Sequence, residues 1–494
     1  MIVIGITFVF NSNSQGISNF WLHGFQGWFG RPGGTSILNF YNSSLDTSWQ
    51  NQKMYFHGTI GQISDSAGNL LFTSNGQWIA NAANDTMLNG TGLNPAFATT
   101  LADSFGLRIN QANLVIPKPG VNKLYYLFHL TADYYPNYNG AKYLYYSLID
   151  MNGDGGLGEV IQKNQIILSN DTIIPGLLTA CKHANGRDWW IFAIGENDNR
   201  WIKYLLTPYG LDGPFFEYVG TIHTAGSLGQ SVFSQDGTKL VKYEAWYGDL
   251  DIFNFDRCTG NISFLEHLDI NDSSLFGGAA FSASGKTLYL SSTNYVYQFD
   301  MTATNIAASV QTVAVWDGYY SPNPPFATLF YLMHLMGDGK IYINCSNSTV
   351  DIHVINYPDS LGVACDVCQH CVALPSINNF TIPNYPNYFL GADTTSLVCD
   401  SLSSGMVNPE YNHLNLKAWP IPTTSGSSIM LTYHTLNDKG GIELYNTNGT
   451  LVKTYPLPPW SQTQTIKLPE LAGGVYLLRL VSGERKGSVK IMVE

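Results

Sequence analysis

The chain of 494 residues is 45% apolar and 13% aromatic, whereas only 12% of its residues are charged. This length allows two or three domains with large cores, and the many Tyr and Gly residues favour strands and tight turns over helices. The net charge of −12 argues against a nucleic-acid partner, because phosphate contacts need a concentrated surface of Lys and Arg. The composition predicts an all-β protein.

The N-terminus begins with an apolar run from Met1 to Phe10, which a polar stretch follows. Ser12 and Ser14 supply the small-x-small pattern that a signal peptidase accepts, so residues 1–14 are predicted to be a signal peptide that is trimmed. The Lys or Arg that usually precedes such a run is missing, and a first strand is the alternative. No later stretch reaches the roughly 18 apolar residues of a membrane helix, so no transmembrane segment is expected.

Between about residues 50 and 400 one pattern recurs: an aromatic-rich strand, a turn with D-G, N-G or S-G, and a second strand. Such turns are typical of β-hairpins, because Gly accepts a positive φ. Repeated antiparallel sheets of 40 to 50 residues predict a β-propeller, in which neighbouring blades cover each other's faces. We expect residues 15–397 to form it, with seven blades and six or eight as alternatives. Examples of the pattern are 65–76, 183–195, 234–246, 282–294 and 337–347.

The composition changes after this region. Residues 398–413 are rich in Ser and Asn with little periodicity, and we expect a linker there. Residues 414–494 contain six or seven short strand patterns separated by N-G and G-G turns, which predict a small immunoglobulin-like β-sandwich.

The last 80 residues resemble the C-terminal sorting domain of proteins that the type IX (Por) secretion system of Bacteroidota-type bacteria exports. The resemblance rests on an opening aromatic-Pro-x-Pro, a middle segment at 444–452, a Gly-Val-Tyr strand and a basic final strand; Ile421 departs from the Asn that is usual in the family. It implies export through the periplasm to the outer cell surface or the medium, with the secretion machinery and its sortase as partners. The motif residues are Trp419, Pro420, Pro422, Gly474, Tyr476, Lys486 and Lys490.

The upstream region, about residues 20–400, resembles the WD-repeat-like propeller often found before such sorting domains in secreted and gliding-associated surface proteins. This resemblance implies a propeller fold and export from the cell. The family has no agreed biochemical activity. The segments that carry it are 63–93, 113–128, 143–164, 254–263, 338–343 and 382–391.

Seven cysteines are present, three of them in the segment Cys365-Asp-Val-Cys368-Gln-His-Cys371. Thiolates at this spacing can bind zinc or an iron–sulfur cluster, but position 375, where a ferredoxin pattern needs its fourth Cys, is Pro375. In an exported protein one or two disulfides, with Cys399 as a possible participant, are the favoured interpretation.

A weak calcium candidate lies at Asp150, Asn152 and Asp154, which match the first half of a calcium-binding loop. The second half fails, because Ile161 stands where the bidentate Glu belongs. Asp, Asn and Gly are also the residues that a β-turn requires, and a turn is the favoured interpretation. We therefore expect no cofactor, with calcium as the alternative.

Three expected loops are unusually rich in Tyr and Trp, and these side chains stack on sugar rings and dominate contact surfaces. The alternative is that they fill the gaps between blades. The ligand-contact candidates are Trp28, Tyr134, Tyr135, Tyr138, Trp316, Tyr319 and Tyr320.

Catalytic motifs are absent from the sequence: it contains no G-x-S-x-G, and its His residues show no zinc-binding spacing. We therefore expect a non-catalytic propeller that binds a glycan or a protein at the cell surface. A secreted hydrolase or lyase acting on polysaccharide is the rival, because propeller glycosidases collect their carboxylates from separate blades. A purely structural role in adhesion or gliding is the third hypothesis.

Overall fold

The computed structural model describes residues 16–27, 33–41, 44–51, 53–102, 105–137, 139–222, 228–322, 325–393, 399, 414, 416–433, 439–459, 461–483 and 485–494. The chain divides into two compact units, residues 1–404 and 405–494. The expected signal peptide, residues 1–14, and all of the expected linker except Cys399 lie outside the described residues.

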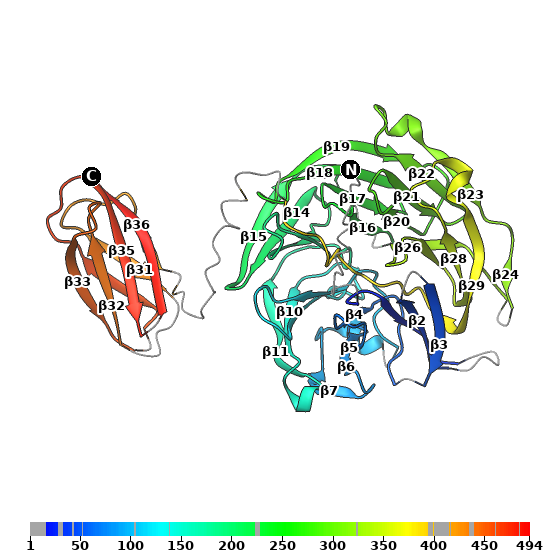
Figure 1. Ribbon diagram of the computed structural model, residues 1–494, viewed down its shortest axis with the longest axis horizontal. Coiled ribbons are helices and arrows are strands. Elements are labelled where there is room, and N and C mark those ends of the chain that lie inside the picture. Colours follow the sequence, from blue (N-terminus) through cyan, green and yellow to red (C-terminus); the bar gives the residue numbers. More distant parts are fainter. Residues whose placement is uncertain are drawn as a thin grey trace, which may run out of the picture. The chain divides into compact units, whose positions relative to one another are not determined.

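The first unit is a ring of antiparallel sheets, and the sheets follow one another around the ring in chain order (Figure 1). Most sheets are meanders of four strands in which each strand pairs with the next one along the chain. This is the architecture of a β-propeller, as the sequence predicts. The expected number of seven blades stays a prediction.

The ring begins with a three-stranded and an eight-stranded sheet. The eight-stranded sheet consists of two four-stranded meanders that one parallel pair, Leu88 with Glu159, joins at their outer strands. Its first meander contains β4 (Gly61–Ser64), β5 (Leu70–Ser74), β6 (Trp78–Asn81) and β7 (Thr86–Thr91). Its second contains β8 (Asn113–Pro117), β9 (Leu124–His129), β10 (Leu144–Asp150) and β11 (Glu159–Leu168). The three-stranded sheet contains β1 (Phe20–His23), β2 (Thr35–Tyr41) and β3 (Ser44–Gln50).

Four further four-stranded sheets continue the ring. They are β12 (Thr179–Lys182) to β15 (Gly210–Tyr218), β16 (Gln230–Phe233) to β19 (Ile262–Asp269), β20 (Gly277–Phe281) to β23 (Gln311–Val315), and β26 (Phe330–Leu335) to β29 (Val367–Asn378). Their middle strands are β13 (Trp189–Ile194), β14 (Arg200–Thr207), β17 (Lys239–Glu244), β18 (Asp249–Phe255), β21 (Thr287–Ser292), β22 (Tyr295–Asp300), β27 (Ile341–Cys345) and β28 (Thr349–Ile355). A short hairpin of β24 (Tyr320–Ser321) and β25 (Phe326–Ala327) precedes the last sheet.

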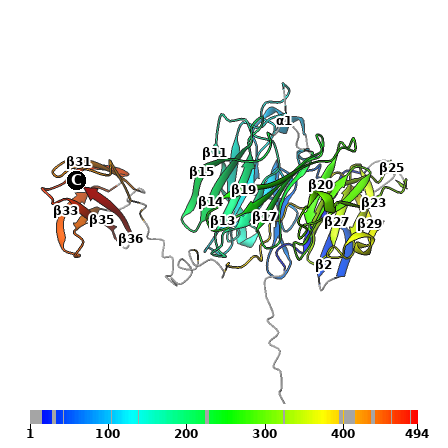
Figure 2. The same cartoon turned by 90° about the horizontal axis from the view of Figure 1, so that it is seen from above.

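Between β7 and β29, the helical elements that the structure describes are short connections. The helix α1 (Phe97–Leu101) joins β7 to β8, and Figure 2 shows it on one face of the ring, which we call the α1 face. The 3-10 turns are η1 (Asp154–Gly156), η2 (Ala307–Ser309) and η3 (Gly362–Cys365).

The ring closes where the first sheet packs on the last. The Ser36 hydroxyl lies 2.8 Å from the Ser376 hydroxyl and accepts a hydrogen bond of 2.9 Å from the Ser376 backbone N–H. Trp21 and Phe40 share one buried apolar cluster with Tyr342 and other residues of the last sheet. Closure of this kind covers strand edges that would otherwise pair with other chains.

The chain does not leave the ring directly after β29. Residues 379–393, which we call the axial segment, cross the middle of the ring, where Figure 1 shows them as the yellow trace. On the α1 face Asn379 O accepts from the backbone N–H of Gly58, just before β4. Further along, Asn384 Nδ2 donates to Asn113 O (3.0 Å) and to Leu178 O (2.9 Å), which belong to two different sheets. The axial segment therefore ties together inner strands from around the ring.

The end of the axial segment is fixed on the face opposite α1. Asn387 Nδ2 donates to Gln235 O (2.7 Å), and Arg257 donates to Gly391 O. Gly237 in the β16–β17 turn has a φ of +72°, and a Cβ there would lie 2.6 Å from Cys181 Sγ and 2.9 Å from Leu390 Cδ2. Gly237 therefore has two roles: it adopts the positive φ that the turn requires, and its missing side chain leaves room for the axial segment.

Two disulfides are present among the described residues. Cys258, in the turn between β18 and β19, pairs with Cys399 and so holds the chain after it leaves the ring. Cys368 pairs with Cys371, while Cys365 is buried and free. This pairing occupies two of the three thiols that the metal interpretation of the cysteine segment requires.

The second unit is a sandwich of two sheets. One sheet contains β30 (Lys417–Trp419), β31 (Ser428–Thr432) and β34 (Thr463–Lys467). The other contains β33 (Leu451–Leu457), β32 (Gly440–Tyr445), β35 (Gly474–Ser482) and β36 (Arg485–Val493). Ile429, Leu444 and Leu478 are fully buried in the cluster between the sheets. The chain therefore ends in a strand that pairs along its whole length with β35.

Candidate functional site

A cavity of about 810 Å³ lies on the α1 face, and we call it the α1-face pocket. It extends over three consecutive sheets: β8–β11, β12–β15 and β16–β19. Two kinds of loop form its wall, those that lead into the first strand of a sheet and those that join the second strand of a sheet to the third. Its lining residues are Ala98, Leu101, Ala102, Leu107, Arg108, Ile109, Thr131, Ala132, Tyr135, Asn139, Pro175, Glu196, Leu228 and Trp246.

Aromatic side chains stand on opposite sides of this pocket. Trp246, in the turn between β17 and β18, is 50% exposed although its indole is among the largest side chains of the protein. Tyr135 lies across the pocket in the β9–β10 connection and stacks on Phe97 of α1, with the ring centroids 6.0 Å apart. Large apolar rings left partly open in a concave site are typical of ligand-binding pockets.

The pocket also contains an unsatisfied carboxylate. Glu196, in the turn between β13 and β14, is only 5% exposed, and its Oε2 accepts no hydrogen bond. Burial raises the pKa of this carboxyl group above its ordinary value. An acceptor that lies in a pocket without a donor is suited to a ligand that brings one, such as a hydroxyl group.

A second charged group, Arg108, is exposed at the edge of the pocket. Its Nε donates to Nδ1 of His57 at 3.1 Å. Burial and the nearby guanidinium lower the pKa of His57 to about 4, so this imidazole is a neutral acceptor at neutral pH. The hydrogen bond to His57 orients Arg108 while leaving its other donors available.

The opposite end of the ring axis is closed by the axial segment. The hollow beside it is only about 50 Å³ and is lined by Pro383, Asn384 and Tyr385 together with inner-strand residues such as Gln230 and His334. The axis is therefore filled by the protein's own Tyr and Asn side chains.

The structure separates the predicted aromatic candidates. Tyr135 lines the α1-face pocket, and Tyr134 lies beside it in the chain, where its hydroxyl donates to Asp171 O at 2.8 Å. Trp316, Tyr319 and Tyr320 form another group near β24, in which Tyr319 stacks on His370 at 4.1 Å and Trp316 meets Tyr320 edge-on. Trp28 and Tyr138 lie outside the described residues.

Sequence reasoning missed Trp246, Arg108 and Glu196. The signal for Trp246 is the pair Trp246-Tyr247 just before Gly248, since two large aromatics in a tight turn cannot both be buried. No comparable signal exists for Glu196, which the structure brings to the pocket from the neighbouring sheet.

The calcium candidates lie in the hairpin between β10 and β11. Asp150 Oδ1 accepts from the backbone N–H of Asn152 (2.8 Å) and from its side-chain amide (2.9 Å). Asp154 begins the 3-10 turn η1. These bonds are those of a side-chain-stabilised turn.

The sorting-motif residues lie on the second unit. Trp419 ends β30 and is 68% exposed, and Pro420 and Pro422 follow it on the surface. Gly474 and Tyr476 belong to β35, where the Tyr476 hydroxyl donates to Ala472 O at 2.9 Å. Lys486 and Lys490 project from the final strand β36 into solvent.

Comparison with known proteins identifies the second unit. Residues 417–494 match the family described as the secretion system C-terminal sorting domain. No curated protein matches the chain.

Solved structures align with the chain at low similarity. A candidate 6-phosphogluconolactonase of Bacteroides fragilis is 12% identical over 69% of this chain and 91% of its own, with a TM-score of 0.43. A protein of Lactobacillus plantarum is 13% identical over 74% of this chain and 98% of its own, with a TM-score of 0.40. The periplasmic gluconolactonase of Pseudomonas aeruginosa is 11% identical over 72% of this chain and 96% of its own, with a TM-score of 0.40.

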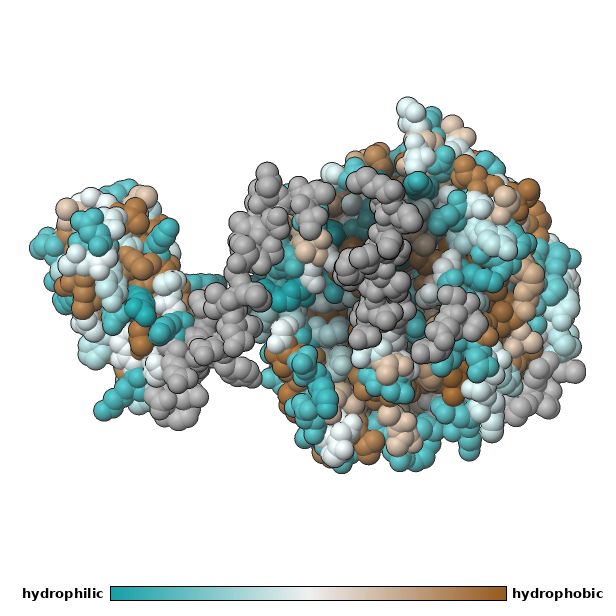
Figure 3. Space-filling model, in the orientation of Figure 1, coloured by the Kyte–Doolittle hydropathy of each residue, from teal (hydrophilic) through white to brown (hydrophobic). Residues whose placement is uncertain are grey.

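Among the described residues, no helix combines the length and the apolar character that crossing a bilayer requires. On the visible face of the molecule, Figure 3 shows hydrophobic residues in small groups between polar ones. The protein is thus an all-β, propeller-like protein that carries a type IX C-terminal sorting domain and is exported to the cell surface or the medium.

Proposed function

We propose that the exported propeller binds a surface or matrix glycan in its α1-face pocket, without catalysis. The observation that carries this proposal is the combination of the half-exposed Trp246 with the buried, unpartnered Oε2 of Glu196 in one cavity. Sugars present apolar faces that stack on aromatic rings and hydroxyl groups that donate to carboxylates.

The size of the pocket supports a small ligand or the end of a chain. Its volume of about 810 Å³ falls within the range of roughly 300 to 1,000 Å³ that ligand pockets usually have. Arg108 and Asn139 add polar groups at the wall, which would fix the orientation of a glycan.

A polysaccharide-cleaving enzyme is the second candidate, because the pKa of Glu196 is raised and such a carboxyl group can act as a general acid. Glycoside hydrolysis usually requires a second carboxylate across the scissile bond. Among the described residues that line the pocket, Glu196 is the one acid. This favours binding over hydrolysis.

We expect Trp246→Ala to weaken glycan binding by roughly 5- to 30-fold, because removal of a stacking ring at a contact centre costs roughly 1 to 2 kcal/mol. A glycan array with the full chain identifies the ligand, and calorimetry measures its affinity for the parent and the variant. Tyr357→Ala is the matched control, since Tyr357 is 62% exposed but lies outside the pocket.

Two results would contradict the proposal. One is an array without any bound glycan, in which case a protein ligand becomes the leading hypothesis. The other is turnover of a bound polysaccharide that Glu196→Gln abolishes while binding persists, which would establish the enzyme instead.

A further inference from the structure

The sheet β16–β19 carries an unusual concentration of charge on one face. The register places Lys242, Asp251 and His267 in one row across β17, β18 and β19. It places Glu244, Asp249 and Asp269 in the next row. Residues paired across antiparallel strands point to the same side with Cβ atoms about 5 Å apart. Four carboxylates therefore share this face with one ammonium group and one imidazole.

The first row is internally satisfied. Asp251 Oδ1 lies 2.8 Å from His267 Nδ1, and Asp251 Oδ2 accepts from the Thr221 hydroxyl at 2.7 Å and lies 3.6 Å from Lys242 Nζ. Asp251 is completely buried, and its contact with Nδ1 fixes the orientation of the His267 imidazole. Nε2, the second ring nitrogen of His267, consequently faces the second row.

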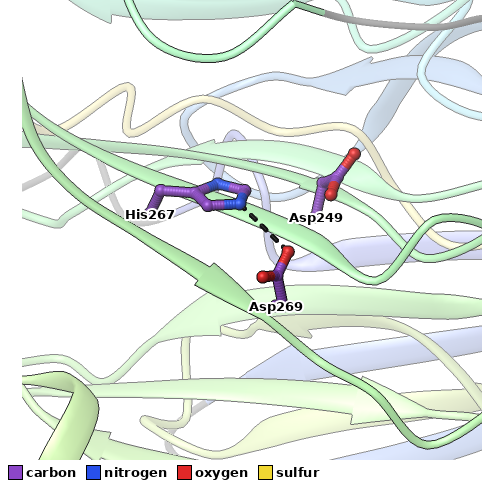
Figure 4. A group of neighbouring side chains, drawn as sticks. All are labelled: Asp249, His267 and Asp269. Carbon is purple, nitrogen blue, oxygen red and sulfur yellow. Dashed lines mark hydrogen bonds and ion pairs between the residues drawn. The ribbon is translucent and has the colours of Figure 1, made fainter.

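The second row consists of three carboxylates. His267 Nε2 lies 3.1 Å from Asp269 Oδ1, and Figure 4 shows Asp249 near the same end of the imidazole as Asp269. One ligand atom from each of Asp249, His267 and Asp269 lies within 4.8 Å of the other two.

Glu244 provides independent evidence that a positive charge belongs here. It stands directly across from Asp249, is completely buried, and neither of its carboxylate oxygens accepts a hydrogen bond. The nearest cation, Lys242 Nζ, is 3.8 Å from Oε2. A buried carboxylate beside two further carboxylates is costly unless a cation lies nearby.

We propose that Asp249, His267 and Asp269 form a binding site for one divalent transition-metal ion, with zinc as the best-fitting ion. An imidazole with two carboxylates is a donor set that suits zinc or manganese, whereas calcium prefers oxygen ligands alone. Asp251 bound to Nδ1 is the outer carboxylate that usually orients a metal-binding histidine and leaves Nε2 free to coordinate.

The location gives the site a structural consequence. Glu244 ends β17 and Asp249 begins β18, so the turn between them, which carries Trp246, is connected directly to the metal site. A bound ion links this turn to Asp269 at the end of β19. The metal site does not depend on the identity of the ligand in the α1-face pocket.

The test uses the full chain after treatment with a chelator, titrated calorimetrically with zinc chloride, manganese chloride or calcium chloride. We expect about one equivalent of zinc per chain, tighter binding of zinc than of calcium, and retention of the zinc through gel filtration. Asp269→Asn and His267→Ala should each weaken zinc binding by roughly 100-fold, because loss of outer-shell partners alone costs 10- to 100-fold.

The control variant is His370→Ala. His370 Nε2 forms a comparable pair with Asp317 Oδ2 at 2.9 Å, but no third ligand completes a group there among the described residues. Its zinc affinity should equal that of the parent. Asp269 is 62% exposed, so its variant keeps the test valid if His267→Ala does not fold. Absence of zinc binding, or equal affinity in Asp269→Asn and the parent, would overturn the proposal.

Discussion

The ring should lose most of its stability on mild acidification, between about pH 6.5 and pH 4, because it buries several neutral histidines. Burial lowers the pKa of His23, His129 and His353 to about 3 and, with the nearby Arg108, lowers that of His57 to about 4. His129 shows how the neutral form is held: its Nδ1 lies 2.8 Å from Asn94 Oδ1 and its Nε2 lies 2.9 Å from Ser147 Oγ.

The sign of the effect follows from proton uptake. In the unfolded chain these four imidazoles bind protons near pH 6.5, whereas in the folded ring they remain neutral until about pH 3 to 4. The unfolded state therefore holds more protons over this interval, and the free energy of unfolding decreases as the pH falls. At pH 5 each imidazole costs about 2 kcal/mol, so four together are comparable with a total stability of roughly 5 to 15 kcal/mol.

Glu244 acts in the opposite direction but is weaker. Burial, helped by the neighbouring carboxylates, raises its pKa from 4.5 to about 7. The resulting free-energy cost to the fold builds up between about pH 4.5 and pH 7, and acidification through this interval relieves it. The relief amounts to roughly 3 kcal/mol, less than half of the combined histidine effect.

Urea unfolding at pH 7.5, 6 and 5, followed by Trp fluorescence, measures how the free energy of unfolding changes with pH. His129→Gln should reduce the pH dependence by about 1.4 kcal/mol per pH unit, because one titrating group is removed. The same substitution at the partly exposed His370 serves as the control. A midpoint that is unchanged between pH 7.5 and pH 5 would contradict the prediction.

Local sequence patterns were sufficient to predict the hairpins of the ring. In the turn between β16 and β17, Asp236 Oδ1 accepts from the Thr238 backbone N–H at 3.0 Å, and Gly237 supplies the positive φ. In the turn between β26 and β27, Asp338 Oδ1 accepts from the Lys340 N–H at 3.1 Å. These bonds join residues two positions apart, so the sequence contains the whole signal.

The axial segment could not be predicted in this way. Residues 382–391 carry part of the resemblance to the propeller family, but the segment from 379 to 393 has no strand alternation, and nothing in its sequence indicates a path across the ring. Its partners are remote: Asn384 and Asn113 are 271 positions apart, and Tyr388 and Val115 are 273 positions apart. Only the closed ring brings them together.

The same limit applies to the α1-face pocket. Tyr135 could be proposed from its loop composition, but Trp246 and Glu196 line the same pocket because three consecutive sheets of the ring form its wall. The charged rows of β17, β18 and β19 likewise depend on strand register, in which a shift of one residue would send Asp249 and Asp269 to opposite faces.

Removal of the Tyr388 side chain should lower the free energy of unfolding by about 3 to 5 kcal/mol, as expected for a buried aromatic replaced by Ala. Tyr388 belongs to the axial segment, and its side chain packs into a large buried apolar cluster. Its ring meets Trp189 edge-on, with the ring centroids 5.8 Å apart, and its hydroxyl donates to Val115 O at 2.7 Å. One side chain thus connects the axial segment to β8 and to β13.

Two variants separate the sources of this stability. Tyr388→Phe keeps the ring but loses the hydrogen bond, so it should cost only about 1 kcal/mol. Phe389→Ala alters the next residue, which is 42% exposed, and should change the stability by less than about 0.5 kcal/mol. Urea unfolding of the three variants at pH 7.5 decides the matter. A similar loss in Phe389→Ala and Tyr388→Ala would mean that the axial segment does not hold the inner strands together, whereas the expected ranking assigns it that role.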